Sequence, residues 1–449
     1  MKKSKKRLII GIIMSFVVLI GIFMFNGVGY IQDIIKEYRI QRYGAPISSS
    51  GEINNRYFDI DSNGENSYKT TKGINEAIKY ANENNIEYVK FEKGTYLIGK
   101  VGSESIPKGI VMQSNINLDL NGSKLLFEPN NFTNYSMIYI GNKENITIKN
   151  GILVGDKEKH IYATNSDNQW GFGIQIIGGR NIQINNMEIQ SFIGDGIIVD
   201  GIYTENIKIS NCNIFSCRRQ GISITSGNYI DIVGNEIHDI KGALPQSGID
   251  LESYKNEQKI QNINIKSNKI YNLESKSAII GYLGVYSLNI ENNDIDGSIE
   301  ISDSRISTNI KKNNIKNSGI FVYNNKKKID LGCSVRNVKI EENNLQDAQI
   351  IVEDIQNSIV RKNSIANGII QIASCEVAVY ENLINNMTSI EKSCAYYMRF
   401  AQEKNESFKV FLYNNVTNGN FKEIIKNVDI NRISIITSKQ ELDDYLNNI

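Results

Sequence analysis

The chain has 449 residues, with 50 lysines and arginines against 49 aspartates and glutamates, which is enough for one large domain or two ordinary ones. Five of the bases lie in residues 1–7, so the remaining body is slightly acidic, with 45 bases against 49 acids. Nucleic-acid binding requires a basic face, so nucleic acid is excluded as a partner. Only two histidines occur, which disfavours a multi-histidine metal site.

The N-terminal segment predicts a membrane anchor. Residues 1–7 read as a basic cytoplasmic tail, and residues 8–25 form an uncharged, almost wholly apolar run just long enough to cross a hydrocarbon core. Because basic residues before such a run stay in the cytoplasm, we expect a single-pass protein of the cell membrane whose C-terminal domain is extracytoplasmic. The alternative is a cleaved signal peptide, although no clear small-x-small site follows the run.

The next segments predict a spacer and a cap. Residues 26–56 are expected to form a juxtamembrane spacer, partly helical near residues 31–42. Residues 70–84 are amphipathic, with Ile74, Ala77 and Ile78 on one face, and a strand is expected over residues 88–98. A stack of strands exposes an unpaired edge that must be covered. The helix is therefore predicted to cap the N-terminal end of a domain spanning residues 57–437.

A short phrase, apolar-x-apolar-x-x-Asn-x-apolar, recurs from residue 146 onwards. Neighbouring copies lie about 20 to 33 residues apart, a period typical of solenoids. The alternation has period two and is rich in Ile and Val, which predicts strands. With no amphipathic helix between copies, consecutive strands must stack in parallel by coiling, as in a parallel β-helix. The recurring asparagines are predicted to form a ladder of hydrogen bonds: Asn235, Asn268, Asn293, Asn313, Asn343, Asn363, Asn382 and Asn415.

The C-terminal segment predicts one more helix. Ser438 and Glu441 have the spacing of a capping box and open a predicted helix within residues 438–449. We interpret this helix as the C-terminal cap of the stack.

Three stretches resemble the pectate-lyase-like superfamily of right-handed parallel β-helix proteins. They are residues 58–98, with the pattern V-x-F-x-x-G-x-Y, residues 211–224 (NCNIFSCRRQGISI) and residues 242–252 (GALPQSGIDLE). The resemblance implies an all-β, right-handed parallel β-helix with a polysaccharide as substrate or ligand. The paired aspartates and Gly-His-Gly of pectin-type hydrolases and the Asp-Pro-His-Asp of alginate epimerases are absent, so the resemblance identifies no single reaction.

Aligning the copies on a recurring Gly-Ile or Ala-Ile dipeptide places several polar residues on one outer wall. The isoleucine faces inward, and the residues one and three places later face outward. The first outward column reads Gln175, Ile198, Ser223, Asp250 and Ile280, and the second reads Ile177, Asp200, Thr225, Glu252 and Tyr282. The turns before these strands supply Asp195, Arg218, Arg219, Gln220 and Gln246.

These residues are the candidate site. We expect four of them to be catalytic: Asp250, Glu252, Arg219 and Asp195. We expect five to bind substrate: Arg218, Gln220, Asp200, Gln246 and Tyr282. Asp200, Asp250 and Glu252 are also potential ligands of Ca²⁺, which takes six or more oxygens, and no other cofactor is indicated.

Three functions fit this composition. We favour a lyase or epimerase acting on an acidic polysaccharide, because arginine binds a sugar carboxylate while a nearby base removes the adjacent proton. An inverting glycoside hydrolase is the first alternative, because Asp250 and Glu252, as alternate residues of one strand, lie about 6.6 Å apart at the backbone, which fits the range expected for inversion. A non-catalytic carbohydrate-binding or structural protein of the cell surface is the second.

Overall fold

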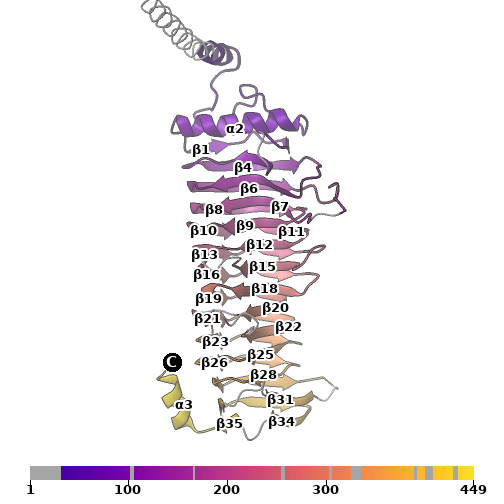
Figure 1. Ribbon diagram of the computed structural model, residues 1–449, viewed down its shortest axis with the longest axis vertical. Helices are drawn as coiled ribbons and strands as arrows, with labels where there is room; N and C mark the ends of the chain where they lie inside the picture. Colours follow the sequence, from indigo (N-terminus) through magenta and orange to yellow (C-terminus); the bar gives the residue numbers. More distant parts are fainter. Residues whose placement is uncertain are drawn as a thin grey trace, which may run out of the picture.

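The computed structural model describes residues 32–101, 106–164, 167–253, 258–302, 306–324, 335–388, 392–399, 408–427 and 433–448. Within them, 35 strands join into one continuous sheet that winds into an elongated stack of coils (Figure 1). The named strands pair in parallel, each with its counterparts in the neighbouring coils. The predicted parallel β-helix is therefore confirmed.

Three ladders of strands run along the stack, and we call them faces A, B and C. Face A comprises β3 (Lys108–Val111), β5 (Asn134–Gly141), β7 (Trp170–Ile177), β9 (Asp195–Asp200), β12 (Gln220–Ile224), β15 (Ser247–Glu252), β18 (Ser277–Leu283), β25 (Gln349–Glu353), β28 (Ile370–Ala373), β31 (Lys392–Arg399) and β34 (Phe421–Asn427). Face B comprises β1 (Tyr88–Lys90), β10 (Glu205–Ser210), β13 (Gly227–Val233), β16 (Ile260–Lys266), β19 (Val285–Glu291), β21 (Ile306–Lys311), β23 (Val338–Glu341), β26 (Ser358–Arg361), β29 (Val377–Tyr380), β32 (Phe408–Tyr413) and β35 (Ile433–Ile436).

Face C is built from the shortest strands. It comprises β2 (Thr95–Ile98), β11 (Asn213–Phe215), β14 (Glu236–His238), β17 (Lys269–Tyr271), β24 (Asn344–Gln346), β27 (Ser364–Ala366), β30 (Leu383–Asn386) and β33 (Val416–Gly419). Five longer strands bend around a corner and belong to two faces: β4 (Asn117–Phe127), β6 (Glu144–Val154) and β8 (Arg180–Gln190) join B to C, and β20 (Asp294–Ser302) and β22 (Asn314–Tyr323) join C to A.

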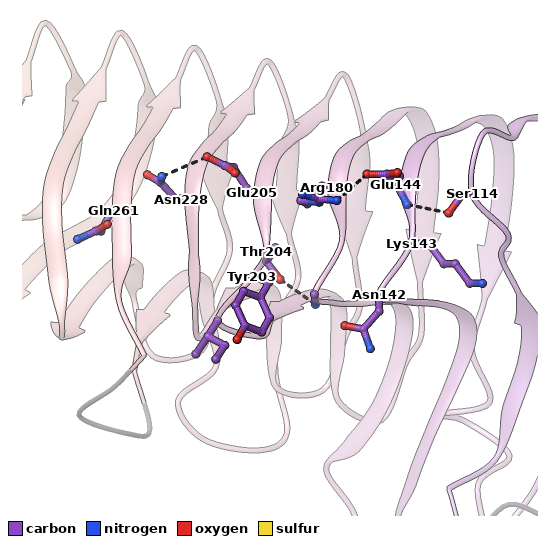
Figure 2. Close-up of a pocket in the computed structure, with 12 residues that line it drawn as sticks. Ser114, Asn142, Lys143, Glu144, Arg180, Tyr203, Thr204, Glu205, Asn228 and Gln261 are labelled. Carbon is purple, nitrogen blue, oxygen red and sulfur yellow. Dashed lines mark hydrogen bonds and ion pairs between the residues drawn. The ribbon is translucent and has the colours of Figure 1, made fainter.

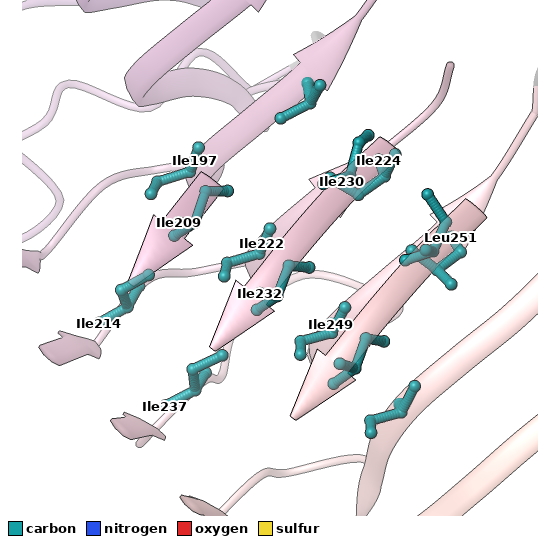
Figure 3. Close-up of a cluster of buried hydrophobic side chains, with 14 of the residues drawn as sticks. Ile197, Ile209, Ile214, Ile222, Ile224, Ile230, Ile232, Ile237, Ile249 and Leu251 are labelled. Carbon is teal, nitrogen blue, oxygen red and sulfur yellow. The ribbon is translucent and has the colours of Figure 1, made fainter. Parts of the chain in front are cut away.

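The core is a set of stacked aliphatic columns. On face A, Ile197, Ile222 and Ile249 are in register in successive coils, and on face B Ile209 and Ile232 are paired in the same way. All five are fully buried (Figure 3). Burying one such side chain contributes about 1.5–3 kcal/mol, and the period-two alternation leaves the residues between them facing outward. The core thus fixes which side chains each coil presents to the outside.

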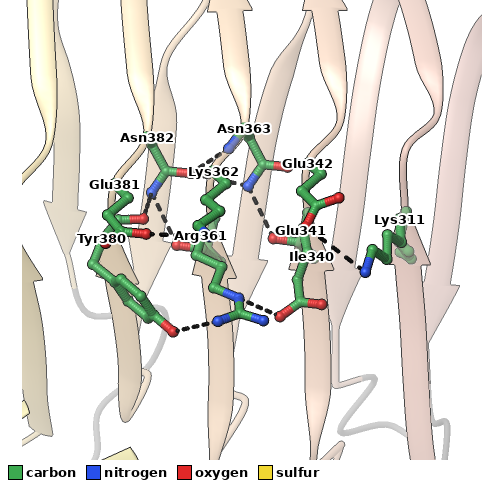
Figure 4. Close-up of polar contacts among 12 residues, drawn as sticks. Lys311, Ile340, Glu341, Glu342, Arg361, Lys362, Asn363, Tyr380, Glu381 and Asn382 are labelled. Atoms are coloured by element: carbon green, nitrogen blue, oxygen red, sulfur yellow. Dashed lines mark hydrogen bonds and ion pairs between the residues drawn. The ribbon is translucent and has the colours of Figure 1, made fainter. Parts of the chain in front are cut away.

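The predicted asparagine ladder is confirmed. The backbone amide and Nδ2 of Asn343 both donate to Oδ1 of Asn363, at 3.0 and 2.9 Å, and Nδ2 also donates to the Ile310 carbonyl at 2.9 Å. The same pattern repeats from Asn235 to Asn415. Figure 4 shows it at Asn363, beside the Arg361 guanidinium that bridges face B neighbours. The ladder satisfies polar groups that are buried at the corner between faces B and C.

We expect Asn343→Ala to destabilise the fold by at least about 2 kcal/mol, because it removes the acceptor of two Asn313 donors and one buried donor to the Ile310 carbonyl. The matched control is Asn344→Ala, whose exposed side chain makes one 3.0 Å bond to Asn314 and should cost less than about 0.5 kcal/mol. Urea denaturation of both variants measures the difference. Equal losses would show that the ladder adds no stability of its own.

The N-terminal cap is confirmed with shifted bounds. Helix α2 (Ser67–Glu83) lies across the first coil (Figure 1) and begins three residues before the expected start. Its residues Ile74, Ala77 and Ile78 are fully buried. The strand expected over residues 88–98 is divided into β1 and β2. A helix also occupies residues 32–43, within the expected spacer.

The C-terminal helix forms as expected but packs elsewhere. In α3 (Lys439–Leu446), the Ser438 hydroxyl accepts from the Glu441 amide at 3.4 Å, as the capping box predicts. Leu442 packs with Ala378 and Phe411 in a separate apolar cluster on the outer side of β29 and β32. Since those outward positions on face B are apolar rather than polar, the helix covers the flank of the stack, and its interpretation as an end cap is corrected.

No helix in the described part of the chain is both long and apolar enough to span a membrane. The expected tail at residues 1–7 and anchor at residues 8–25 lie outside the described residues.

Candidate functional site

The strand register of face A supports the expected first outward column. Ser223 of β12 pairs with Ile198 of β9 on one side and with Asp250 of β15 on the other. Because Ile222 and Ile249 face the core, Ser223 and Asp250 point away from it. The sequence alignment therefore brings together residues from three neighbouring coils on one wall.

A buried ion pair lies at the centre of this wall. Nη1 of Arg219 is 2.9 and 3.2 Å from the two carboxylate oxygens of Asp195 and 2.7 Å from Oε1 of Gln220. The guanidinium lies over the Trp170 ring, 4.9 Å from its centroid. Arg219 is 5% exposed and Asp195 is fully buried. Burial raises the pKa of Asp195 while Arg219 opposes that shift, so the arginine is engaged within the protein.

Two neutral side chains connect this pair to Asp250. The Ser223 hydroxyl donates to Oδ2 of Asp195 at 2.7 Å and also contacts Oε1 of Gln220. Nε2 of Gln220 donates to Oδ2 of Asp250. Ser223 is the member that sequence reasoning left without a role, although it lies in the same outward column. The network holds the Asp250 carboxyl in one orientation.

The pKa of the Asp250 carboxyl group is raised. Burial, followed by the neighbouring Glu252 carboxylate, raises its pKa from 3.8 to about 7, with Arg219 opposing. Asp250 is 5% exposed, whereas Glu252, the last residue of β15, is partly exposed. Near neutral pH the wall therefore presents one carboxyl group close to its own pKa beside a second, more accessible one.

The Asp200 carboxylate has a structural role, because one of its oxygens accepts three hydrogen bonds from the protein. Its Oδ1 accepts from the Thr225 hydroxyl at 2.7 Å, from the Gly201 amide at 2.7 Å and from Nε2 of Gln258 at 2.9 Å. These bonds fix the turn after β9 and tie the next two coils to it. Among the described residues, no group of three or more Asp, Glu, His or Cys side chains is arranged to hold a metal ion. The potential calcium site of Asp200, Asp250 and Glu252 is therefore not assembled.

The positions of two expected site residues, Tyr282 and Gln246, follow from the strand register and from a turn contact. A register shift between Leu251 and Glu252 places Leu283, rather than Tyr282, opposite Glu252. Counting along the sequence does not reveal this bulge. Gln246 has a left-handed backbone, with φ 59°, and donates to Glu274 at 2.9 Å in the next turn. Neither residue is placed beside Asp250 by these contacts.

Arg218 borders the wall from the turn before β12. Its Nη1 donates to the Asn168 carbonyl at 2.7 Å, and its guanidinium lies over the Tyr162 ring, 5.1 Å from the centroid. The side chain is partly exposed and anchors the segment between β6 and β7. In the coil after Arg219, the fully buried hydroxyl of Ser247 has no hydrogen-bond partner among the described residues.

The comparisons with known proteins agree with this architecture. A family profile described as "Right handed beta helix region" matches residues 170–331, which include the whole candidate site. The SPbeta prophage-derived uncharacterized protein YorA of Bacillus subtilis (strain 168) is 37% identical over 154 residues, 31% of this chain and 26% of that protein. The uncharacterized protein YclG of the same organism is 32% identical over 256 residues, 51% and 43% of the two chains. The chain thus spans less than half of either relative.

Solved structures resemble the whole stack. The A-module of the mannuronan C-5 epimerase AlgE4 of Azotobacter vinelandii has a TM-score of 0.54 at 12% identity, over 85% of this chain and 98% of that one. A tailspike protein mutant of E. coli bacteriophage HK620, in complex with a pentasaccharide, has a TM-score of 0.51 at 12% identity, over 84% and 78%. Identities this low show the fold alone. Together with the parallel register, these matches identify the chain as a right-handed parallel β-helix protein.

Proposed function

We propose that this protein acts on a polysaccharide through the carboxyl pair of Asp250 and Glu252 on face A. The observation that carries the proposal is the pKa of Asp250, which burial and Glu252 raise to about 7 beside a more exposed carboxylate. Paired carboxyl groups whose environments separate their protonation states are the usual acid and base of glycan chemistry. The tailspike and the epimerase, both glycan proteins by name, support a glycan as ligand.

Inverting glycoside hydrolysis is the reaction that this pair supports best. Asp250 would donate its proton to the glycosidic oxygen as that bond breaks, and Glu252 would accept a proton from the water that attacks the anomeric carbon. The two residues alternate on β15, so both side chains leave the same side of that strand, with their backbones about 6.6 Å apart. Gln220 orients the acid through its bond to Oδ2.

A lyase or epimerase acting on an acidic polysaccharide is the second candidate, and the two adjacent arginines favour it. It requires a cation that is free to bind the sugar carboxylate. Arg219 is already paired with Asp195, and Arg218 with the Asn168 carbonyl. The arginine positions therefore support this reaction less well than the carboxyl pair supports hydrolysis.

We further propose that the body is extracytoplasmic and tethered to the cell membrane by residues 8–25. The basic residues 1–7 followed by an uncharged apolar run support this arrangement. Such a location would place the wall of face A in contact with surface or environmental polysaccharides.

Product analysis tests the proposal. We expect the purified full-length chain, incubated with panels of neutral and acidic polysaccharides with and without Ca²⁺, to release new reducing ends whose initial anomeric form is inverted, as read by NMR. Ultraviolet absorbance from an unsaturated uronate would instead identify a lyase. Binding of a glycan without any product would identify a carbohydrate-binding protein and contradict the catalytic assignment.

A further inference from the structure

A groove of about 560 Å³ follows the corner where face A turns into face B. One wall is the turn after β9, which carries Ile202 and Tyr203 at its tip. The other wall is the first outward column of face B. This groove shares no lining residue with the network around Asp250, so it is a separate feature of the surface.

The face B wall is a regular ladder of polar side chains. Five residues from successive coils are in register and form a single row (Figure 2): Glu144, Arg180, Glu205, Asn228 and Gln261. The row spans four strand spacings, about 19 Å. Arg180 donates to Glu144 at 2.8 Å and Asn228 to Glu205 at 3.5 Å. Each rung thus offers a planar carboxylate, guanidinium or amide with hydrogen-bonding capacity to spare.

The opposite wall is the turn after β9, which presents one exposed aromatic side chain and one exposed aliphatic side chain. Tyr203 is 72% exposed and Ile202 is 57% exposed, although the turn that carries them is fixed. The Thr204 hydroxyl accepts from the Gly178 amide at 2.9 Å, and the Thr204 amide donates to Gly201 at 3.0 Å. Gly201 has φ +95°, and a Cβ there would lie 2.6 Å from the Gly178 nitrogen. The backbone of the turn therefore keeps Tyr203 at the edge of the groove.

The charges of the groove select against ionic ligands. Lys143 and Arg180 balance Glu144 and Glu205 among the lining residues, so the groove carries no net charge that would attract a polyanion. An exposed aromatic face attracts the C–H groups of a sugar ring, while paired carboxylate and amide groups bind its hydroxyls. Ile202 and Tyr203 together place exposed apolar surface at the edge of this polar groove, an arrangement found at ligand-binding sites.

We propose that this groove is a glycan-binding site for a neutral oligosaccharide, in which Tyr203 stacks on one sugar and the face B row binds successive hydroxyl groups. The site is independent of the carboxyl pair on face A. It would hold a glycan chain against the stack whether or not that chain is cleaved.

Calorimetric titration of the full-length chain tests this assignment. The probes are two neutral hexasaccharides, cellohexaose and maltohexaose, and the anionic hexagalacturonate. We expect at least one neutral hexasaccharide to bind, and Tyr203→Ala to weaken that binding about tenfold, as loss of a well-placed aromatic contact does. The matched control is Tyr38→Ala, which removes a 54% exposed tyrosine on the helix at residues 32–43 and should leave the affinity unchanged.

The proposal fails if no neutral hexasaccharide binds, if hexagalacturonate binds in preference to both, or if Tyr203→Ala binds as the unaltered chain does. Asp250→Asn separates this site from the one on face A. Groove binding should survive that substitution, whereas a glycan bound only at the carboxyl pair would respond to Asp250→Asn and not to Tyr203→Ala.

Discussion

Asp250→Asn is expected to lower turnover of the glycan by about 10²–10⁴-fold, the contribution typical of a positioned general acid. Asparagine keeps the shape of the neutral carboxyl group and its contact with Gln220, but it has no acidic proton to transfer to the glycosidic oxygen. Initial rates of reducing-end release measure the effect. Asp294→Asn, on the exposed side of face C, is the matched control and should retain full activity.

The same substitution should alter stability only at higher pH. Folding raises the pKa of Asp250 from 3.8 to about 7, so the folded state holds the extra proton. The resulting stabilisation is fully present below about pH 4 and is lost as the pH rises through 7, a change of up to about 4 kcal/mol. Asp250→Asn should match the unaltered protein at pH 4 and exceed its stability at pH 8, as measured by thermal unfolding. A large loss of stability at low pH would show that Asp250 is structural.

Arg219→Met is expected to destabilise the protein by about 3–5 kcal/mol, because it leaves the fully buried Asp195 without its partner. It also removes the bond to Gln220 and the contact with Trp170. Denaturant titration measures the loss. The control is Arg180→Met, which breaks an exposed pair with Glu144 and should cost less than about 1 kcal/mol.

A second variant tests the cause of that loss. Combining Arg219→Met with Asp195→Asn removes both charges and keeps an acceptor for the Ser223 hydroxyl. We expect the double variant to recover a substantial part of the stability that the single variant loses. If single and double variants unfold at the same denaturant concentration, then the contacts of the arginine, and not the unpaired charge, explain the effect.

The fold was predictable because its rules are periodic. The alternation of Ile and Val determines which side of each strand is buried, and a single recurring asparagine marks one corner of each coil from Asn235 to Asn415. The apolar face of residues 70–84 likewise indicated which side of that helix is buried. Each signal is local, repeated many times, and consistent with the global stack.

The candidate site was predictable only in outline. Strand register follows from the Gly-Ile alignment, so Ser223 and Asp250 came together as expected. The burial of Arg219 did not follow from the sequence, because its guanidinium lies over the ring of Trp170, a residue of another coil whose position has no periodic signal. The shift opposite Glu252 displaced Tyr282 for the same reason: a bulge is one irregular residue in a regular pattern.

The placement of α3 depended on a break in the pattern. Ala378 and Phe411 occupy outward positions where most coils carry polar residues. A helix with an apolar stripe finds that surface on the flank of face B. Such exceptions to the alternation are visible in the sequence, but only once the inward and outward registers are known.

The strands of each coil pair only with those of the coils before and after it, and side-chain contacts reach at most a coil or two further, so cooperativity weakens with distance along the axis. The residues of β9, β12 and β15 are joined to one another by direct bonds, while the region from β25 to β35 reaches them only through intervening coils. Fraying that starts at the far end can therefore advance some way before any atom near Asp250 moves. Local unfolding of the C-terminal coils should therefore leave the site around Asp250 intact.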